Sequence, residues 1–197
     1  ILNVAKSTLS VWLRDYPLTR EQIRVLRDWN AIRIEKFRQT MRAKREKRVK
    51  EVYENQKRKL LPLSKKELFL AGLFLYWGEG TKAGTSSVSI SNTDPAVIKF
   101  TLYWLTKILD IPKKDVKVYL HLYKDMDIRK EQRFWSNELG VSLKNFRKSY
   151  IKKSTREHID HSGFGHGTCN LLIESVKLKE KILMGIKAVT DYYNSKT

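Results

Sequence analysis

The hydrophobic and polar positions of this chain follow two different periods. Residues 116–123 alternate strictly, and residues 88–91 do so over a shorter stretch, which is typical of strands with one buried face. Elsewhere apolar residues recur every three or four positions, as they do along one side of a helix. The pattern predicts strands at 88–91, 116–123 and 168–175, and helices at 65–78, 94–109, 128–139 and 177–193.

Local signals mark the ends of these helices. Ser64 and Glu67 form a capping-box pattern ahead of the first one. Asp94 followed by Pro95 is a strong helix start, because proline fits the first helical position, and Gly140 is placed to end the third helix. The order of elements over residues 63–197 predicts an α+β domain, with an antiparallel sheet and helices packed on one of its faces.

Residues 18–62 are expected to form one long helix that links this domain to the N-terminal segment. It opens with a capping box at residues 19–22, and no Gly or Pro interrupts it before Pro62. If it is continuous, its forty residues span ~60 Å. Its first half carries an apolar stripe, formed by Ile23, Leu26, Trp29, Ile32 and Phe37.

The second half of this helix is basic. Residues 33–59 contain twelve Lys or Arg and four Glu, a net charge of +8. We interpret the helix as a spacer that also contacts phosphates, and the alternative is a solvated charged face without a binding role. The candidate DNA-binding residues here are Arg42, Lys44 and Arg45.

Residues 1–17 are expected to form a tight turn at Asn3 and then a short helix. Small polar and basic side chains share one side of that helix, as suits a helix lying in a major groove. The segment resembles the second half of a helix-turn-helix, although an ordinary amphipathic helix fits the same pattern. Its candidate DNA-binding residues are Lys6, Ser7, Ser10 and Arg14.

The charge of the chain favours a polyanionic partner. Forty Lys and Arg face twenty-one Asp and Glu, which gives a net charge of +19, and phosphate backbones reward such an excess through counterion release. A thermophile-like charged surface is the alternative, but there Glu rises together with Lys. The single cysteine, Cys169, excludes an internal disulfide framework and fits a reducing cytosol.

No apolar run is long enough to span a bilayer, and the start of the chain does not have the pattern of a signal peptide. We therefore expect a cytoplasmic protein, nucleoid-associated in a prokaryote, with residues missing before Ile1.

An apolar helix pattern over residues 68–80 ends abruptly in Gly-Glu-Gly. Residues 70–73, with Glu79 and Gly80, resemble the motif of single-motif LAGLIDADG proteins, and the domain at 63–197 has the expected order of elements. Five residues separate Leu73 from Glu79, two more than in that family. The resemblance implies that Gly72 and Gly78 bring two helices together in a shifted register.

The same resemblance implies a homodimer through residues 68–80, because one motif per chain must pair with its copy. It also implies that paired Glu79 carboxylates hold Mg²⁺ at the scissile phosphates of DNA. A carboxylate at a helix C-terminus opposes the helix dipole, which independently indicates a purpose for Glu79. Lys82, just beyond it, is a weaker catalytic candidate that could contact phosphate.

Two further groups of residues are candidates. The polar face of the strand at 116–123 mixes cations with aromatic rings, as DNA-reading sheets do, and consists of Lys117, Tyr119, His121 and Tyr123; a solvated sheet face is the alternative. A zinc site could be built from His158, His161, His166 and Cys169. We favour a loop for the first two histidines and a core position for Cys169 over zinc binding.

These observations favour a sequence-specific, double-stranded-DNA-binding homodimer. The resemblance implies a homing-type endonuclease that hydrolyses DNA with Mg²⁺. The alternatives are a transcriptional regulator that keeps the scaffold without cutting, and an RNA-binding splicing helper.

Overall fold

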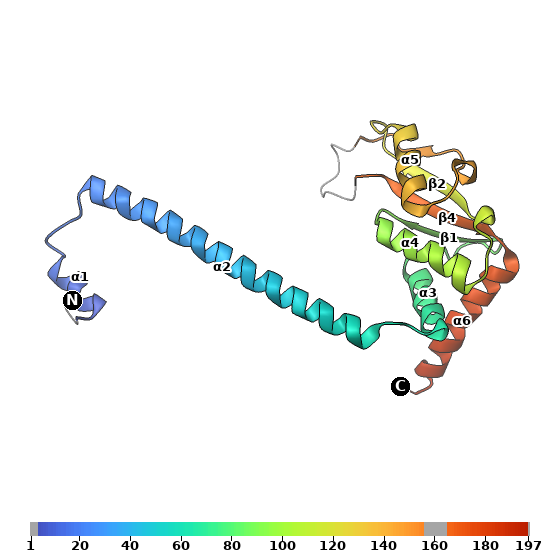
Figure 1. Cartoon of the computed structure of the whole chain (residues 1–197), viewed down its shortest axis with the longest axis horizontal. Coiled ribbons are helices and arrows are strands. Elements are labelled where there is room, and N and C mark those ends of the chain that lie inside the picture. Colours follow the sequence, from blue (N-terminus) through green and yellow to red (C-terminus); the bar gives the residue numbers. More distant parts are fainter. Residues whose placement is uncertain (1–3, 156–164, 197) are drawn as a thin grey trace. The chain divides into compact units, whose positions relative to one another are not determined.

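The computed structural model describes residues 4–155 and 165–196, and the chain divides into two units, Ile1–Pro62 and Leu63–Thr197 (Figure 1). The first unit contains the helices α1 (Lys6–Trp12) and α2 (Arg20–Leu60). The turn expected at Asn3 lies outside the described residues. The capping box that opens α2 is confirmed, because Gln22 N donates to Thr19 Oγ1 at 3.2 Å and Thr19 N donates to Gln22 Oε1 at 2.8 Å.

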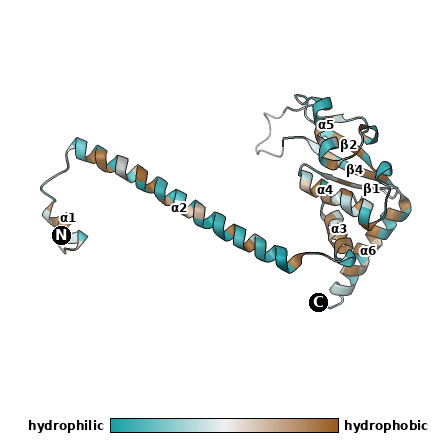
Figure 2. Cartoon of the chain, in the orientation of Figure 1, coloured by the Kyte–Doolittle hydropathy of each residue, from teal (hydrophilic) through white to brown (hydrophobic). Residues whose placement is uncertain are grey.

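Helix α2 is continuous over 41 residues, but its apolar stripe is not buried. Ile23, Leu26, Ile32 and Phe37 are all exposed, and the side chain of Trp29 lies outside the described part. Figure 2 shows α2 as mainly hydrophilic with scattered hydrophobic residues. Pairs one helical turn apart support it instead, including Arg42 Nε to Glu46 at 3.0 Å.

The second unit contains the seven longer helices and strands that the sequence predicts, and several shorter elements that it does not. Its elements, in chain order, are α3 (Lys65–Glu79), β1 (Ser87–Asn92), α4 (Pro95–Tyr103), a π-helix (Trp104–Ile108), a 3₁₀ turn (Lys113–Asp115), β2 (Lys117–Leu122), α5 (Ile128–Leu139), a second 3₁₀ turn (Leu143–Asn145), β3 (Tyr150–Ile151), β4 (Thr168–Glu174) and α6 (Val176–Asn194).

The helix boundaries follow from capping residues. Ser64 and Glu67 exchange hydrogen bonds at the start of α3, and Asp94 caps α4 by accepting from Ala96 N at 2.8 Å. Gly140 ends α5 in the left-handed conformation, with φ 57° and ψ 38°. The helix expected to continue to residue 109 changes to π geometry at Trp104.

The four strands form one sheet in the order β1-β4-β2-β3. Strand β4 is antiparallel to both β1 and β2, whereas β3 is parallel to β2. The chain is therefore α+β as expected, but the expectation of a wholly antiparallel sheet is wrong. The cause is α5, which connects β2 to β3 as a crossover and returns the chain in its original direction.

One face of the sheet forms the core with α3, α4, α5 and α6. Strand β2 shows why, since Val118, Leu120 and Leu122 are fully buried while the residues between them are only half-buried. The predicted alternation of this strand is confirmed. Its polar residues therefore lie on the opposite face, which is called the open face below.

Candidate nucleic-acid interface

The open face presents three rows of side chains that cross the sheet. Each row joins residues that pair directly between neighbouring strands, so their side chains point to the same side. The rows are Ser89–Leu172–Lys117, Ser91–Asn170–Tyr119 and, toward β3, Thr168–His121–Tyr150. Hydroxyl, amide, imidazole and phenol groups thus line one surface.

Several contacts hold these side chains in place. Ser89 Oγ donates to Asn170 Oδ1 at 2.8 Å, and the ring of Tyr150 meets His121 edge-on with centroids 5.5 Å apart. Lys117 forms an ion pair with Glu174. Of the predicted set, Lys117, Tyr119 and His121 share one side of β2, whereas Tyr123 follows the end of the strand and packs partly against the core. The charge of Lys117 is partly neutralised.

The far end of β2 adds a cation to this surface. Lys152 Nζ lies 4.5 Å from the centroid of the Tyr123 ring. Partial burial, and then the positive charge of Lys152, lower the pKa of His121 from its ordinary value. His121 is therefore neutral at physiological pH, with one ring nitrogen donating and the other accepting.

Glu79 is the last residue of α3, and its side chain is exposed. Within the described residues its carboxylate has no hydrogen bond or ion pair. Lys82 folds back instead, and its Nζ donates to the carbonyl of Gly78 at 3.3 Å. The two predicted catalytic candidates therefore lie at the same helix tip, with Lys82 acting as a cap on α3.

A lysine that the sequence analysis missed lies beneath this tip. Lys179, from α6, is only 1% exposed, and its Nζ donates to Tyr76 Oη at 2.7 Å and to the carbonyl of Thr81. Tyr76 Oη donates to the same carbonyl at 2.5 Å. A buried lysine usually has a carboxylate partner. Lys179 instead bonds to the carbonyl of Thr81, which is two residues after Glu79.

The helical periodicity of α6 places Lys179 on the same side as buried residues. Lys179 is three residues before Ile182 and seven before Ile186, and both isoleucines are buried. A lysine at such a position is normally expected to extend along the apolar surface to solvent. The periodicity alone therefore gave no reason to single it out.

The exposed side of α3 is apolar. Phe74 and Trp77 are each 47% exposed, and their rings lie 5.9 Å apart. Gly78 borders them, and a Cβ added there would meet nothing within 4 Å. Gly72, in contrast, faces the core, where a Cβ would lie 2.0 Å from Trp104 Nε1. The expectation that Gly72 contacts a second helix is wrong, because Trp104 of the same chain fills that space.

The candidate DNA-binding residues of the first unit are all exposed. They form two groups, one at α1 and one on α2. Lys6, Ser7, Ser10 and Arg14 lie in or just after α1, a seven-residue helix in which no residue is buried. Arg42, Lys44 and Arg45 are exposed on α2, and Arg42 is paired with Glu46.

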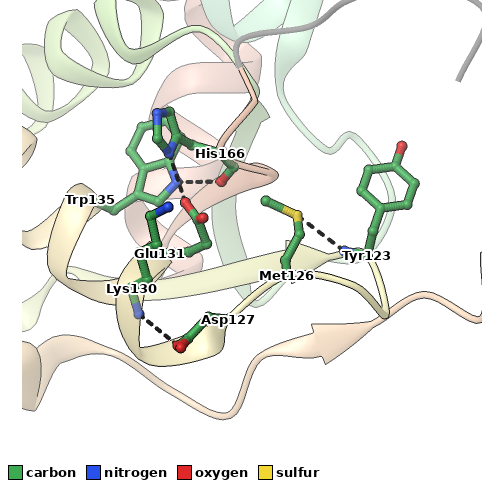
Figure 3. Close-up of polar contacts among 7 residues, drawn as sticks. All are labelled: Tyr123, Met126, Asp127, Lys130, Glu131, Trp135 and His166. Atoms are coloured by element: carbon green, nitrogen blue, oxygen red, sulfur yellow. Dashed lines mark hydrogen bonds and ion pairs between the residues drawn. The ribbon is translucent and has the colours of Figure 1, made fainter. Parts of the chain in front are cut away.

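Two of the four residues considered for a zinc site, His166 and Cys169, lie in the described part of the chain. His158 and His161 lie outside the described residues. Figure 3 shows His166 beside Glu131, with Nδ1 and Oε2 2.7 Å apart, and the His166 carbonyl accepts from Trp135 Nε1. Cys169 is fully buried in the core, and burial raises the pKa of its thiol. In the described part of the chain, no three His, Cys, Asp or Glu side chains are grouped to hold a metal.

None of the helices in residues 4–155 and 165–196 combines the length and the hydrophobicity that crossing a bilayer requires. Comparisons with protein-family models, with curated proteins and with solved structures found no match.

Proposed function

We propose that the protein is a sequence-specific, double-stranded-DNA-binding homodimer built on a LAGLIDADG-like domain. The observation that carries this proposal is the composition of the open face. Asn170, Tyr119 and His121 offer donors and acceptors on one surface, and base edges in a major groove are recognised by such groups. The excess of Lys and Arg, with a net charge of +19, supports a phosphate-bearing partner.

The exposed side of α3 supports self-association. Phe74 and Trp77 form an apolar stripe that ends at Gly78, where the backbone is open to close approach. An isologous pairing of two such helices would bury this stripe on both chains. It would also bring the two Glu79 carboxylates near the two-fold axis, so the helices cross at Gly78 and not at Gly72.

DNA hydrolysis is the proposed activity of this tip. Mg²⁺ binds through one or two carboxylates together with waters and substrate phosphates, so one exposed Glu79 from each chain of a homodimer fits the ion. When bound, Mg²⁺ stabilises negative charge that develops on a phosphate. Lys179 lies under the tip, where its fixed ammonium adds positive charge from the protein itself.

A non-cleaving regulator is the second candidate. Among the described residues no three His, Cys, Asp or Glu side chains are grouped to hold a metal, and the exposed Glu79 belongs to no such group, which favours the regulator. Such a protein would use the open face and the basic helix α2 for binding alone.

Incubation with a random-sequence duplex library, with Mg²⁺ and with EDTA, tests these proposals. Retention of duplexes with a shared sequence supports DNA binding. Breakage that needs Mg²⁺ and disappears in Glu79→Gln supports the endonuclease, whereas retention without breakage in either protein supports the regulator. Preferential competition by structured RNA at fixed salt would replace both with an RNA-binding role.

A further inference from the structure

Three exposed cations surround a hollow at one end of the sheet. Lys114 comes from the 3₁₀ turn before β2, Lys144 from the turn after α5, and Arg147 from the segment leading to β3. The hollow measures about 450 Å³, and all three side chains line it. No ion pair within the described residues engages any of them.

The backbone under these cations is held by one side chain. Asn145 Nδ2 lies within hydrogen-bond distance of the carbonyls of Val116, Lys113 and Lys114, at 2.8, 3.1 and 3.3 Å. This amide ties the turn that carries Lys144 to the turn that carries Lys114. The two turns therefore keep a fixed separation, although they are about thirty residues apart in the sequence.

The backbone of Arg147 is anchored to β2, close to these two turns. Its backbone N donates to the carbonyl of Val118 at 2.9 Å, which anchors it to the edge of β2. The neighbouring 3₁₀ turn is closed by Ser142, which accepts from Asn145 N at 2.9 Å. The backbone positions from which the three side chains extend are thus set before any ligand arrives, which lowers the part of the entropy cost of binding that comes from the backbone.

The charge of the hollow stays positive after its acids are counted. Its lining contains two carboxylates, Asp115 and Glu174, and Glu174 is already paired with Lys117. Four cations therefore face two carboxylates, and an anion is the ligand that this lining favours.

The hollow adjoins the open face through Lys117. This residue ends the row Ser89–Leu172–Lys117 and also lines the hollow. A duplex whose base edges meet the open face has its sugar-phosphate strands at the margins of that face. We propose that Lys114, Lys144 and Arg147, the basic corner, bind backbone phosphates of duplex DNA, an inference that rests on the proposed DNA-binding function.

The basic corner acts as a positioning site. Lysine and arginine on phosphate fix the register of the protein on the duplex without distinguishing bases. Each phosphate contact that is lost lowers the slope of log affinity against log salt by about 0.9. Loss of the corner therefore changes the salt dependence of all sequences alike.

The test compares two doubly substituted proteins of equal charge. Lys144→Ala/Arg147→Ala removes two cations of the corner, and Lys66→Ala/Lys107→Ala removes two exposed cations elsewhere on the same unit. Binding to a fixed duplex is measured between about 50 and about 200 mM salt. We expect the corner variant to lose about 1 to 2 units of slope, and the control to keep the wild-type slope.

Equal slopes for the two variants would overturn the basic corner while leaving DNA binding intact. A wild-type protein that shows no salt-dependent duplex binding would overturn the proposed function, and the corner with it. Asn145→Ala, which keeps every cation but removes the amide, is expected to lose slope in the same direction while its circular dichroism stays that of the wild type. An unchanged slope in that variant would contradict the role given to the Asn145 amide in holding the cations of the basic corner in place.

Discussion

The indole of Trp104 occupies the space that a side chain at position 72 would need. A Cβ on Gly72 would lie 2.0 to 2.3 Å from three atoms of that indole, and Trp104 is itself completely buried. The helix α3 can therefore pack on the π-helical segment only with glycine at this position. The two residues connect the α3 motif to the core of its own chain.

The first prediction concerns the stability of this contact. We expect Gly72→Ala to destabilise the fold by about 3 kcal/mol or more, because neither the α3 backbone nor the buried indole has room to move. Gly78→Ala on the same helix is the matched control when both variants are measured as monomers, and its effect should then stay within about 1 kcal/mol because nothing in the same chain lies near its Cβ. Urea denaturation of both variants measures the difference, and equal stabilities would contradict the packing described.

The second prediction concerns self-association. Phe74→Ser/Trp77→Ser should convert the proposed dimer to monomer in sedimentation equilibrium, because it removes the apolar stripe of α3. Both side chains are half-exposed in the chain, so folding should change little. Val176→Ser/Met184→Ser, which alters two exposed apolar residues of α6, serves as the control. If both variants keep the wild-type mass, the dimer does not form through α3.

The third prediction separates stability from activity at Lys179. Lys179→Met keeps most of the side-chain volume and leaves Tyr76 donating to the Thr81 carbonyl. We expect the stability to stay within about 1 kcal/mol or to rise, because a buried charge is replaced by an apolar group. Mg²⁺-dependent cleavage should fall, because the positive charge beneath the tip is lost. Lys181→Met, at an exposed position of the same helix, should change neither. Loss of stability with unchanged cleavage would make Lys179 a structural residue only.

The fourth prediction concerns base recognition on the open face. Ser89 donates to Asn170 Oδ1, which leaves the Asn170 amide nitrogen available as a donor. Asn170→Ala should relax the preferred sequence at one position, at a cost of about 1–3 kcal/mol in discrimination. The salt slope should stay at the wild-type value, in contrast to the basic corner. Selection from a duplex library measures the change, and an unchanged preference would remove Asn170 from the reading surface.

The sequence predicted those parts of the fold that repeat a pattern over several residues. The alternation in β2 placed Lys117, Tyr119 and His121 on one side correctly, since one face of that strand lies on the core. Strand β3 escaped prediction because Tyr150 and Ile151 are too few to show a period. Its parallel pairing depends on the α5 crossover, which is a property of the tertiary structure.

The candidate site was predicted less completely, because the role of each residue depends on which side chains surround it in the folded chain. Gly72 and Gly78 look alike in the motif, yet one faces Trp104 and the other faces solvent. Lys179 is one of many lysines in the sequence, and only the packing of α6 against α3 identifies it. No sequence pattern indicated a role for Asn145, since its three carbonyl contacts join turns that are distant in the chain.

The last prediction follows from the lowered pKa of His121. Burial is the main cause and the charge of Lys152 the second, so the protonated imidazole is less favourable in the folded protein than in the unfolded chain. As the pH falls below the ordinary histidine value of about 6.5, the unfolded chain takes up the proton first. The contribution of His121 to stability is therefore present above that pH and is lost as the pH falls through the lowered pKa.

An NMR titration of the His121 ring measures this shift directly, and Lys152→Ala should raise its pKa only part of the way, because burial remains. Lys66→Ala, distant in sequence and exposed, should leave the titration unchanged. In urea denaturation, His121→Gln should lose less stability than the wild type between about pH 7 and about pH 5. A His121 that titrates at or above the value of an unfolded peptide would contradict the partial burial of the open face, and with it the neutral imidazole proposed to meet DNA.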